Sequence, residues 1–203
     1  MTPNIHHEKR EIIGERFELT KGPIYWLGPD LTLRDCTVVI SAAGRSLVPM
    51  SGQFINCTIQ AKGLLKGVAW APMKLKGCRF KGSFSGNDFG FRADLFDREK
   101  AGGVEDCDFS EARLNGCRFF NCDMSTIRLP LWPCFSFMDP LGHAAELVRR
   151  EWPGQFGIVV EGLAKNPAGT VAESWHAPTV AEKMDTTVEG LRAALEGAPW
   201  VVM

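Results

Sequence analysis

A five-residue period that runs without a break from Cys107 to Leu129 constrains the fold of this chain more than any other feature. Bulky apolar residues occupy one position of the period and small or apolar residues occupy the position two residues earlier: Phe109, Leu114, Phe119, Met124 and Leu129 in the first series, and Cys107, Ala112, Cys117, Cys122 and Ile127 in the second. A helix needs apolar residues at mixed spacings of three and four, and a half-buried strand needs strict alternation. The period fits neither and predicts a repeat architecture.

A longer period extends the repeat toward the N-terminus. The pattern apolar-x-x-Cys-x-apolar returns at spacings of 21, 21 and 29 residues, with its cysteine at Cys36, Cys57, Cys78 and Cys107. A weaker copy without the cysteine precedes them at Ile12 and Phe17. One coil of a β-solenoid takes about 20 residues, so each return predicts one turn of a stack. The surplus between Phe80 and Val104 predicts a loop outside the wall.

Four consecutive units, residues 107–111, 112–116, 117–121 and 122–126, resemble the pentapeptide-repeat proteins. The unit of that family is a small residue, a polar one, Leu or Phe, and two variable ones. The resemblance covers about residues 31–129, is best over 104–129 and is absent from 130–203. It implies a right-handed, four-sided parallel β-helix in which the Leu/Phe and small positions point inward and the other three point outward.

The seven cysteines are predicted to fill this narrow interior, because Cys is small and among the most buried residues. Zinc sites need closely spaced cysteine pairs, which the repeat units do not offer, and an odd number of thiols cannot pair completely. We expect no metal and no cofactor. The polar start of the chain lacks the apolar run of a signal peptide, and no stretch approaches the roughly 18 apolar residues of a membrane span. A reduced, cytoplasmic protein is therefore expected.

The charges are distributed unevenly along the chain. Between Asp35 and Asp88 there are seven bases and no acid, whereas Asp88 to Asp123 contains nine acids and five bases. If the coils stack in sequence order, the early coils would be basic and the later coils acidic, and the resulting electric field would steer a charged partner. The alternative is an ordinary solvated surface on which the charges are unevenly distributed by chance. The candidate partner-binding residues are Lys62, Lys66, Trp70, Lys74, Lys76, Arg79 and Lys81.

The repeat ends at Pro130, where proline interrupts any sheet ladder. We therefore divide the chain into a solenoid of about five coils with an N-terminal cap, residues 1–133, and a small α+β appendage, residues 134–203. The appendage is predicted to cover the end of the solenoid; an interaction surface or a homodimer contact is the alternative. The fold class is thus mainly β, a right-handed parallel β-helix with this appendage.

Within the appendage, the sequence predicts a helix that starts at Pro140, a strand over 156–160 and a strand over 200–203. Possible capping boxes at Thr179 and Thr186 predict two further helix starts. The six tryptophans lie outside the regular inward positions and are expected to pack the junction of coil and appendage. One of them, Trp70, could instead anchor a partner, since Trp is enriched at binding hot spots.

No nucleophile elbow, phosphate-binding loop or metalloprotease motif occurs in the sequence. His143 and Glu146 share a predicted helix face, which is a weak metal signal. The favoured function is a non-catalytic scaffold that binds another protein, with an immunity or antitoxin-type inhibitor of a bacterial toxin as one version. The partner is expected to carry an acidic surface; nucleic acid and membrane are not expected partners.

Two other functions stay open. The resemblance implies a DNA mimic that protects a type II topoisomerase, but this needs an acidic solenoid, and residues 1–133 carry 18 bases and 15 acids. A carbohydrate-active β-helix enzyme would need a carboxylate pair in a groove. The inward assignment itself predicts that Phe119→Asp prevents folding. It also predicts that Arg118→Asp, at an outward position, costs no more than about 0.5 kcal/mol.

Overall fold

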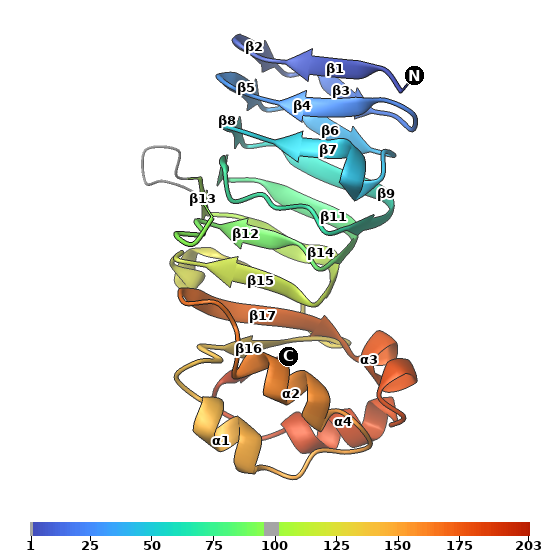
Figure 1. Ribbon diagram of the computed structural model, residues 1–203, viewed down its shortest axis with the longest axis vertical. Coiled ribbons are helices and arrows are strands. Elements are labelled where there is room, and N and C mark those ends of the chain that lie inside the picture. The colour runs from blue at the N-terminus through green and yellow to red at the C-terminus, as the bar shows by residue number, and fades with distance from the viewer. Residues whose placement is uncertain (1, 96–101) are drawn as a thin grey trace.

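The protein is a mainly β structure, 43% strand and 17% helix, built on a parallel β-solenoid of about four turns. The computed structural model describes residues 2–95 and 102–203 of the chain. Figure 1 shows the coils stacked in sequence order along the long axis, with the N-terminus at one end and the helices gathered at the other. The fold class predicted from the repeat is confirmed.

The early coils each contribute one strand to three parallel sheets. Sheet A contains β1 (Asn4–His7), β4 (Ile24–Leu27) and β7 (Leu47–Pro49). Sheet B contains β2 (Arg10–Ile13), β5 (Leu31–Arg34), β8 (Gly52–Ile55), β10 (Met73–Lys76) and β13 (Gly103–Glu105). Sheet C contains β3 (Arg16–Leu19), β6 (Thr37–Ile40), β9 (Thr58–Lys66), β11 (Arg79–Ser85) and β14 (Asp108–Asn115).

The strand register reproduces the 21-residue period. Leu33 pairs with Phe54, and Phe54 pairs in turn with Leu75. The weak N-terminal copy is a true coil, because Ile12 and Phe17 are buried in register with the coil that follows. Residues 4–19 therefore form the first coil of the stack. Five strands stack in sheets B and C, which corresponds to about four turns between the first and the last.

The corner before each repeat cysteine has a left-handed backbone. Asp35, Asn56, Gly77 and Asp106 have φ angles of 54°, 53°, 64° and 53°. Among non-glycine residues, Asn and Asp tolerate this region best, and Gly adopts it freely. The residue type at these positions therefore lets the chain turn from sheet B into sheet C at the same place in every coil.

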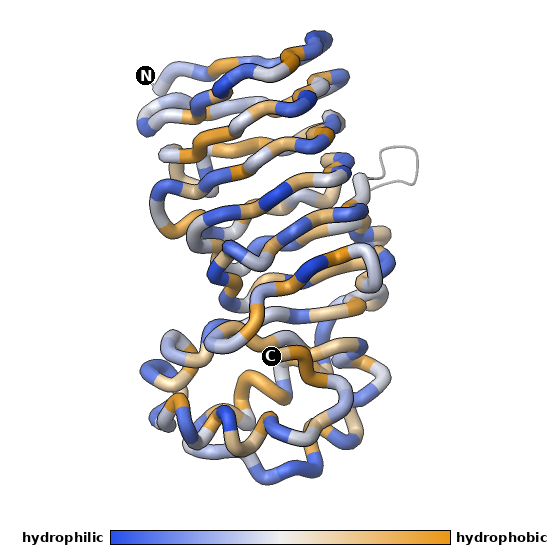
Figure 2. The backbone as a smooth tube through the Cα atoms, turned by 180° about the vertical axis from the view of Figure 1, so that it is seen from behind, coloured by the Kyte–Doolittle hydropathy of each residue, from blue (hydrophilic) through white to orange (hydrophobic). Residues whose placement is uncertain are grey.

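The cysteines fill the interior as predicted. Six of the seven are buried and Cys122 is half-buried, and all seven are free thiols. The repeat thiols bond to carbonyl groups of the preceding coil: Cys57 Sγ donates to Leu33 O at 3.4 Å and Cys78 Sγ donates to Phe54 O at 3.2 Å. Figure 2 shows how apolar and polar residues alternate along the coils. This alternation places one row of side chains inside and leaves the next outside.

Trp70 lies inside the solenoid, contrary to the sequence-based interpretation. Its side chain is fully buried, its ring stacks on Phe89 at a centroid distance of 6.3 Å, and its Nε1 donates to Asn87 Oδ1 at 3.1 Å. Asn87 is fully buried as well and donates to Leu65 O at 2.9 Å, the kind of bond that the cysteines make to the preceding coil. The irregular fourth coil thus uses a Trp–Asn pair as core.

Three strands of sheet C bend and add a further side to the later coils. The register between β9 and β11 shifts between Lys81 and Ser83, so the second halves of these strands pair separately. Gly82 stands at this bend with φ 100°, and a Cβ there would meet Ala61 O at 2.3 Å. Only glycine fits so close to the neighbouring backbone. The four-sided cross-section implied by the resemblance thus has its counterpart in these later coils.

The C-terminal part continues the solenoid through a mixed sheet, in which the two solenoid strands are parallel and the three C-terminal strands pair antiparallel. Sheet D runs from β12 (Asp88–Gly90) and β15 (Cys117–Phe120) to β17 (Thr170–His176), β16 (Cys134–Met138) and β18 (Val201–Val202). Because β17 pairs with β15, the last strand of the solenoid on this side has no open edge. The second core lies beyond this sheet and includes Phe135, Phe137, Phe156 and Leu191.

The helices of this part are α1 (Ala144–Arg149), α2 (Gly157–Leu163), α3 (Ala177–Lys183) and α4 (Val188–Leu195). The strand expected over 156–160 is wrong, since this apolar run forms most of α2, which packs with α1. The N-cap of α4 is Thr187, which accepts from Gly190 N, and α3 begins at Ala177, two residues before the expected Thr179. None of the helices in the described ranges has the length and apolar character needed to cross a membrane.

Candidate functional site

The structure distributes the seven candidate partner-binding residues over different faces. Lys74 and Lys76 project from sheet B, and Arg79 and Lys81 project from the first half of β11 in sheet C. Lys62 and Lys66 lie in the second half of β9, beyond the bend. Trp70 is fully buried, so it offers nothing to a docking partner. The seven therefore do not form a single patch.

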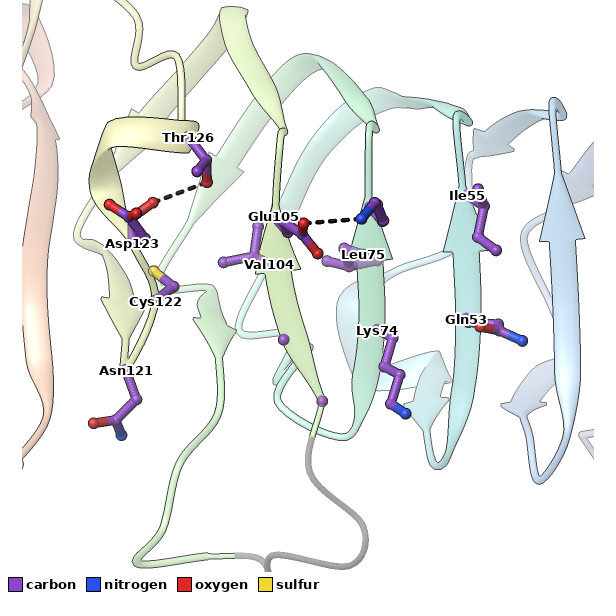
Figure 3. Close-up of a pocket in the computed structure, with 13 residues that line it drawn as sticks. Gln53, Ile55, Lys74, Leu75, Val104, Glu105, Asn121, Cys122, Asp123 and Thr126 are labelled. Carbon is purple, nitrogen blue, oxygen red and sulfur yellow. Dashed lines mark hydrogen bonds and ion pairs between the residues drawn. The ribbon is translucent and has the colours of Figure 1, made fainter.

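A groove of about 570 Å³ lies over the outer face of sheet B (Figure 3). Its floor is formed by β8, β10 and β13, with Ile55 and Lys74 in it. One wall is the turn that carries Cys122 and Asp123, just before the short 3-10 helix η3 (Met124–Thr126). Gly103 pairs with Lys74 and carries no side chain, which leaves the space open. The groove thus combines apolar and charged groups.

The two carboxylates of this groove are already engaged. Glu105 Oε1 accepts from Lys76 Nζ at 2.8 Å. Asp123 Oδ1 accepts from Ser125 N at 2.9 Å, and these hydrogen bonds from Ser125 lower the pKa of the Asp123 carboxyl. A glycosidase-type acid needs a raised pKa. The lowered pKa of Asp123 is the opposite of what such an acid needs.

Ion pairs between successive coils neutralise much of the predicted charge polarity. Lys76 pairs with Glu105 at 2.8 Å, and Lys81 pairs with Glu111 at 2.8 Å. Arg79 lies 3.8 Å from Asp108, also one coil further on. The bases of one coil thus face the acids of the next in parallel register. Exposed pairs of this kind add little stability, typically below about 1 kcal/mol, but they occupy Lys76, Arg79 and Lys81, three of the candidate binding residues.

A second charge network surrounds Asp88, and it corrects the prediction for Arg118. Asp88 is buried, and its carboxylate accepts from Arg118 Nε at 2.9 Å and Nη2 at 3.0 Å and from Arg92 Nη1 at 2.7 Å. Both guanidinium groups also lie over the ring of Phe120, at 5.5 Å and 4.9 Å. Arg118 points outward as predicted, but it holds a buried charge. Charge reversal there would not be harmless.

The weak metal signal at His143 and Glu146 is an ion pair at the start of α1. His143 Nδ1 lies 3.9 Å from Glu146 Oε2, and the His143 ring stacks near Trp200. Among residues 2–95 and 102–203, no group of three or more His, Cys, Asp or Glu side chains is placed to hold a metal ion. The loop expected between Phe80 and Val104 lies in part outside the described residues.

No protein-family model matches this chain, and no curated protein matches it.

Proposed function

We propose that this protein is a non-catalytic scaffold that binds another protein through the outer wall of its solenoid. We further infer that it is a diverged solenoid of the pentapeptide-repeat type, because the predicted small and bulky positions of the repeat are the buried ones. In particular, Cys107, Ala112 and Cys117 occupy the small position, and Phe109 and Phe119 occupy the bulky one.

The observation that carries the proposal is the pre-organisation of the outer wall. Continuous ladders from β2 to β13 and from β3 to β14 fix the outward side chains in rows. Ion pairs such as Lys76–Glu105 further restrict the motion of some of these side chains. A rigid surface loses little conformational entropy when it binds, and this is the usual source of affinity for repeat proteins. The groove over sheet B offers both apolar and charged contacts within that surface.

The reactive groups of the repeat support the same proposal. The Cys117 thiol faces the interior and donates to Phe84 O, and burial raises its pKa to about 12. A thiol in this state is a poor nucleophile. Among the acids of the later coils, Glu105 and Glu111 pair with bases of the preceding coil, which reduces the open acidic surface that imitation of DNA requires. An immunity or antitoxin-type inhibitor is the version of the scaffold that we favour.

The test is capture of a partner by the full chain in its native host. Tagged protein is cross-linked in cells and purified, and the bound proteins are quantified against the bait. A stoichiometric partner is expected, and a toxin encoded beside this gene would support the inhibitor version. Circular dichroism of the purified bait checks that it is folded. Recovery of the folded bait without a bound protein would refute the proposal. Protection of a topoisomerase in a supercoiling assay would favour the DNA-mimic alternative instead.

A further inference from the structure

One side of the solenoid carries bases and no acid. We define the basic side as residues 20–23, 41–46, 61–67, 82–86 and 112–116, which are the corners of successive coils beyond sheet C. These segments contain no Asp or Glu, and their five bases are Lys21, Arg45, Lys62, Lys66 and Arg113. All five are exposed. The outward rows of sheets B and C, in contrast, carry both signs, as in the pairs Arg34–Glu11 and Lys81–Glu111.

The segments of the basic side are contiguous in space. A groove of about 490 Å³ is lined by Lys21, Arg45 and Leu64 from three successive coils. Leu64 pairs with Ser83, which pairs in turn with Arg113. The short 3-10 helix η1 (Gly44–Ser46) packs closely against the end of β9, since a Cβ at Gly44 would lie 1.8 Å from Lys66 O. The five bases therefore belong to one continuous surface.

The positive charge on this side is not neutralised. Within residues 2–95 and 102–203, no ion pair involves Lys21, Arg45, Lys62, Lys66 or Arg113. The neighbouring bases Lys76 and Lys81 each hold a carboxylate at 2.8 Å. Like charges close together raise the local potential. The basic side is thus available for the anionic groups of another molecule.

An apolar side chain stands in the middle of this charge. Leu64 is 53% exposed and lies between Lys62 and Lys66 on the outer face of β9. Its neighbours in the groove include the apolar Ile40 and Ala42. An apolar centre with a charged rim is the usual composition of a protein-binding surface. A phosphate backbone would gain nothing from Leu64.

We propose that the basic side docks an acidic segment of a partner protein, with an apolar residue of that segment seated against Leu64. Its carboxylates pair with Lys62 and Lys66 and, along the wall, with Arg45 and Arg113. The inference rests on the proposed scaffold function and names the chemistry of the partner. A nucleic acid is disfavoured because the chain has a net charge of −1, and because Phe84, the aromatic residue of this side, is buried and cannot stack on bases.

The test uses fluorescence anisotropy with three labelled probes: a short acidic peptide with one central leucine, the same peptide with serine at that place, and a short DNA duplex. Lys66→Glu is expected to weaken binding of the leucine peptide about tenfold, a loss typical for one member of a charge pair across an interface. The matched control Lys9→Glu reverses an exposed lysine in the turn between β1 and β2, outside the basic side and outside the groove over sheet B. Its effect should stay below about twofold, as expected for a charge remote from the contact.

Leu64→Ser separates the apolar contact from the charge. It should weaken the leucine peptide about fivefold, within what burial of one leucine provides, and leave the serine peptide unchanged. Thermal unfolding of each variant checks that it is folded. The inference is overturned if the duplex binds as tightly as the leucine peptide, if Lys66→Glu and Lys9→Glu have equal effects, or if Leu64→Ser changes nothing.

Capture in the native host distinguishes this inference from the scaffold function. A partner that is recovered by the wild-type chain but lost with Lys62→Glu/Lys66→Glu supports both. A partner recovered equally by both proteins keeps the scaffold function and overturns the role of the basic side. If no partner is recovered while the peptide pattern holds, the scaffold function fails and the preference of the basic side for acidic segments stands.

Discussion

The aromatic column inside the later coils makes the stability of the solenoid open to a direct test. Phe109 is fully buried, and its ring lies 4.2 Å from Phe80 in a stacked geometry, 5.0 Å from Phe89 and 5.2 Å from Phe119. Truncation of a buried Phe to Ala costs about 3–5 kcal/mol. Continuous backbone ladders on either side prevent the coils from closing on the cavity, so we expect Phe109→Ala to cost about 4–5 kcal/mol, near the top of that range.

The assay is equilibrium unfolding in urea followed by circular dichroism. The midpoint should fall while the slope stays constant, because the same surface is exposed on unfolding. Ser110→Ala, at the exposed neighbouring position, is the control and should change stability by less than about 0.5 kcal/mol. Phe80→Leu combined with Phe109→Leu should show a coupling of about 1 kcal/mol from the stacked pair. A loss below about 2 kcal/mol for Phe109→Ala would show that the column is not packed as described.

Three further predictions follow from the charged and thiol groups. Arg118→Asp should destabilise the protein by about 3 kcal/mol or more, measured by chemical denaturation, since it leaves the buried Asp88 facing a second carboxylate; a loss within about 0.5 kcal/mol would restore the simple outward assignment. Burial raises the pKa of the Glu173 carboxyl above its usual 4.5. The folded state therefore binds this proton more tightly than the unfolded state does, which stabilises the protein at low pH. This stabilisation is lost as the pH rises through the pKa of the folded state. Glu173→Gln should therefore make the melting temperature fall less as the pH rises, and the variant should have the higher melting temperature at neutral pH. An unchanged dependence of melting temperature on pH would contradict the burial argument. Native protein should react slowly with Ellman's reagent at pH 8, because six of the seven thiols are buried out of reach of the reagent and burial raises the pKa of the seventh, Cys122, to about 12. Unfolded protein should titrate seven thiols; one rapidly reacting thiol in the folded state would be inconsistent with this.

The sequence by itself determines the direction of the side chains in the repeat. The spacing locates the small and bulky positions, the resemblance to pentapeptide repeats implies that both point inward, and the structure buries residues such as Cys107, Phe109 and Phe119 at these positions. The corners are determined in the same way, because Asp35, Asn56 and Gly77 are residue types that accept a left-handed backbone. Both properties are local, and each coil repeats them.

Regions without a period were less predictable. The apolar run over 156–160 is compatible with a buried strand or a buried helix, and its length does not decide between them. Packing against the second core decides it, since α2 buries Val159, Val160 and Leu163 together. Trp70 was misplaced for a related reason. It lies in a segment that departs from the repeat, and only its pairing with Asn87, 17 residues away, shows that it fills the interior.

The candidate binding surface was decided by the tertiary structure. Sequence clustering grouped seven residues, but pairing with the next coil removed Lys76, Arg79 and Lys81. The pairs join residues 29 or 30 positions apart, a spacing set by the extra residues of the fourth coil. The basic side places Lys21 and Arg113, from the first and last coils, on the same side of the solenoid. Such a surface is invisible in sequence, because coil stacking puts residues of successive coils, about 20 positions apart along the chain, a single strand spacing apart.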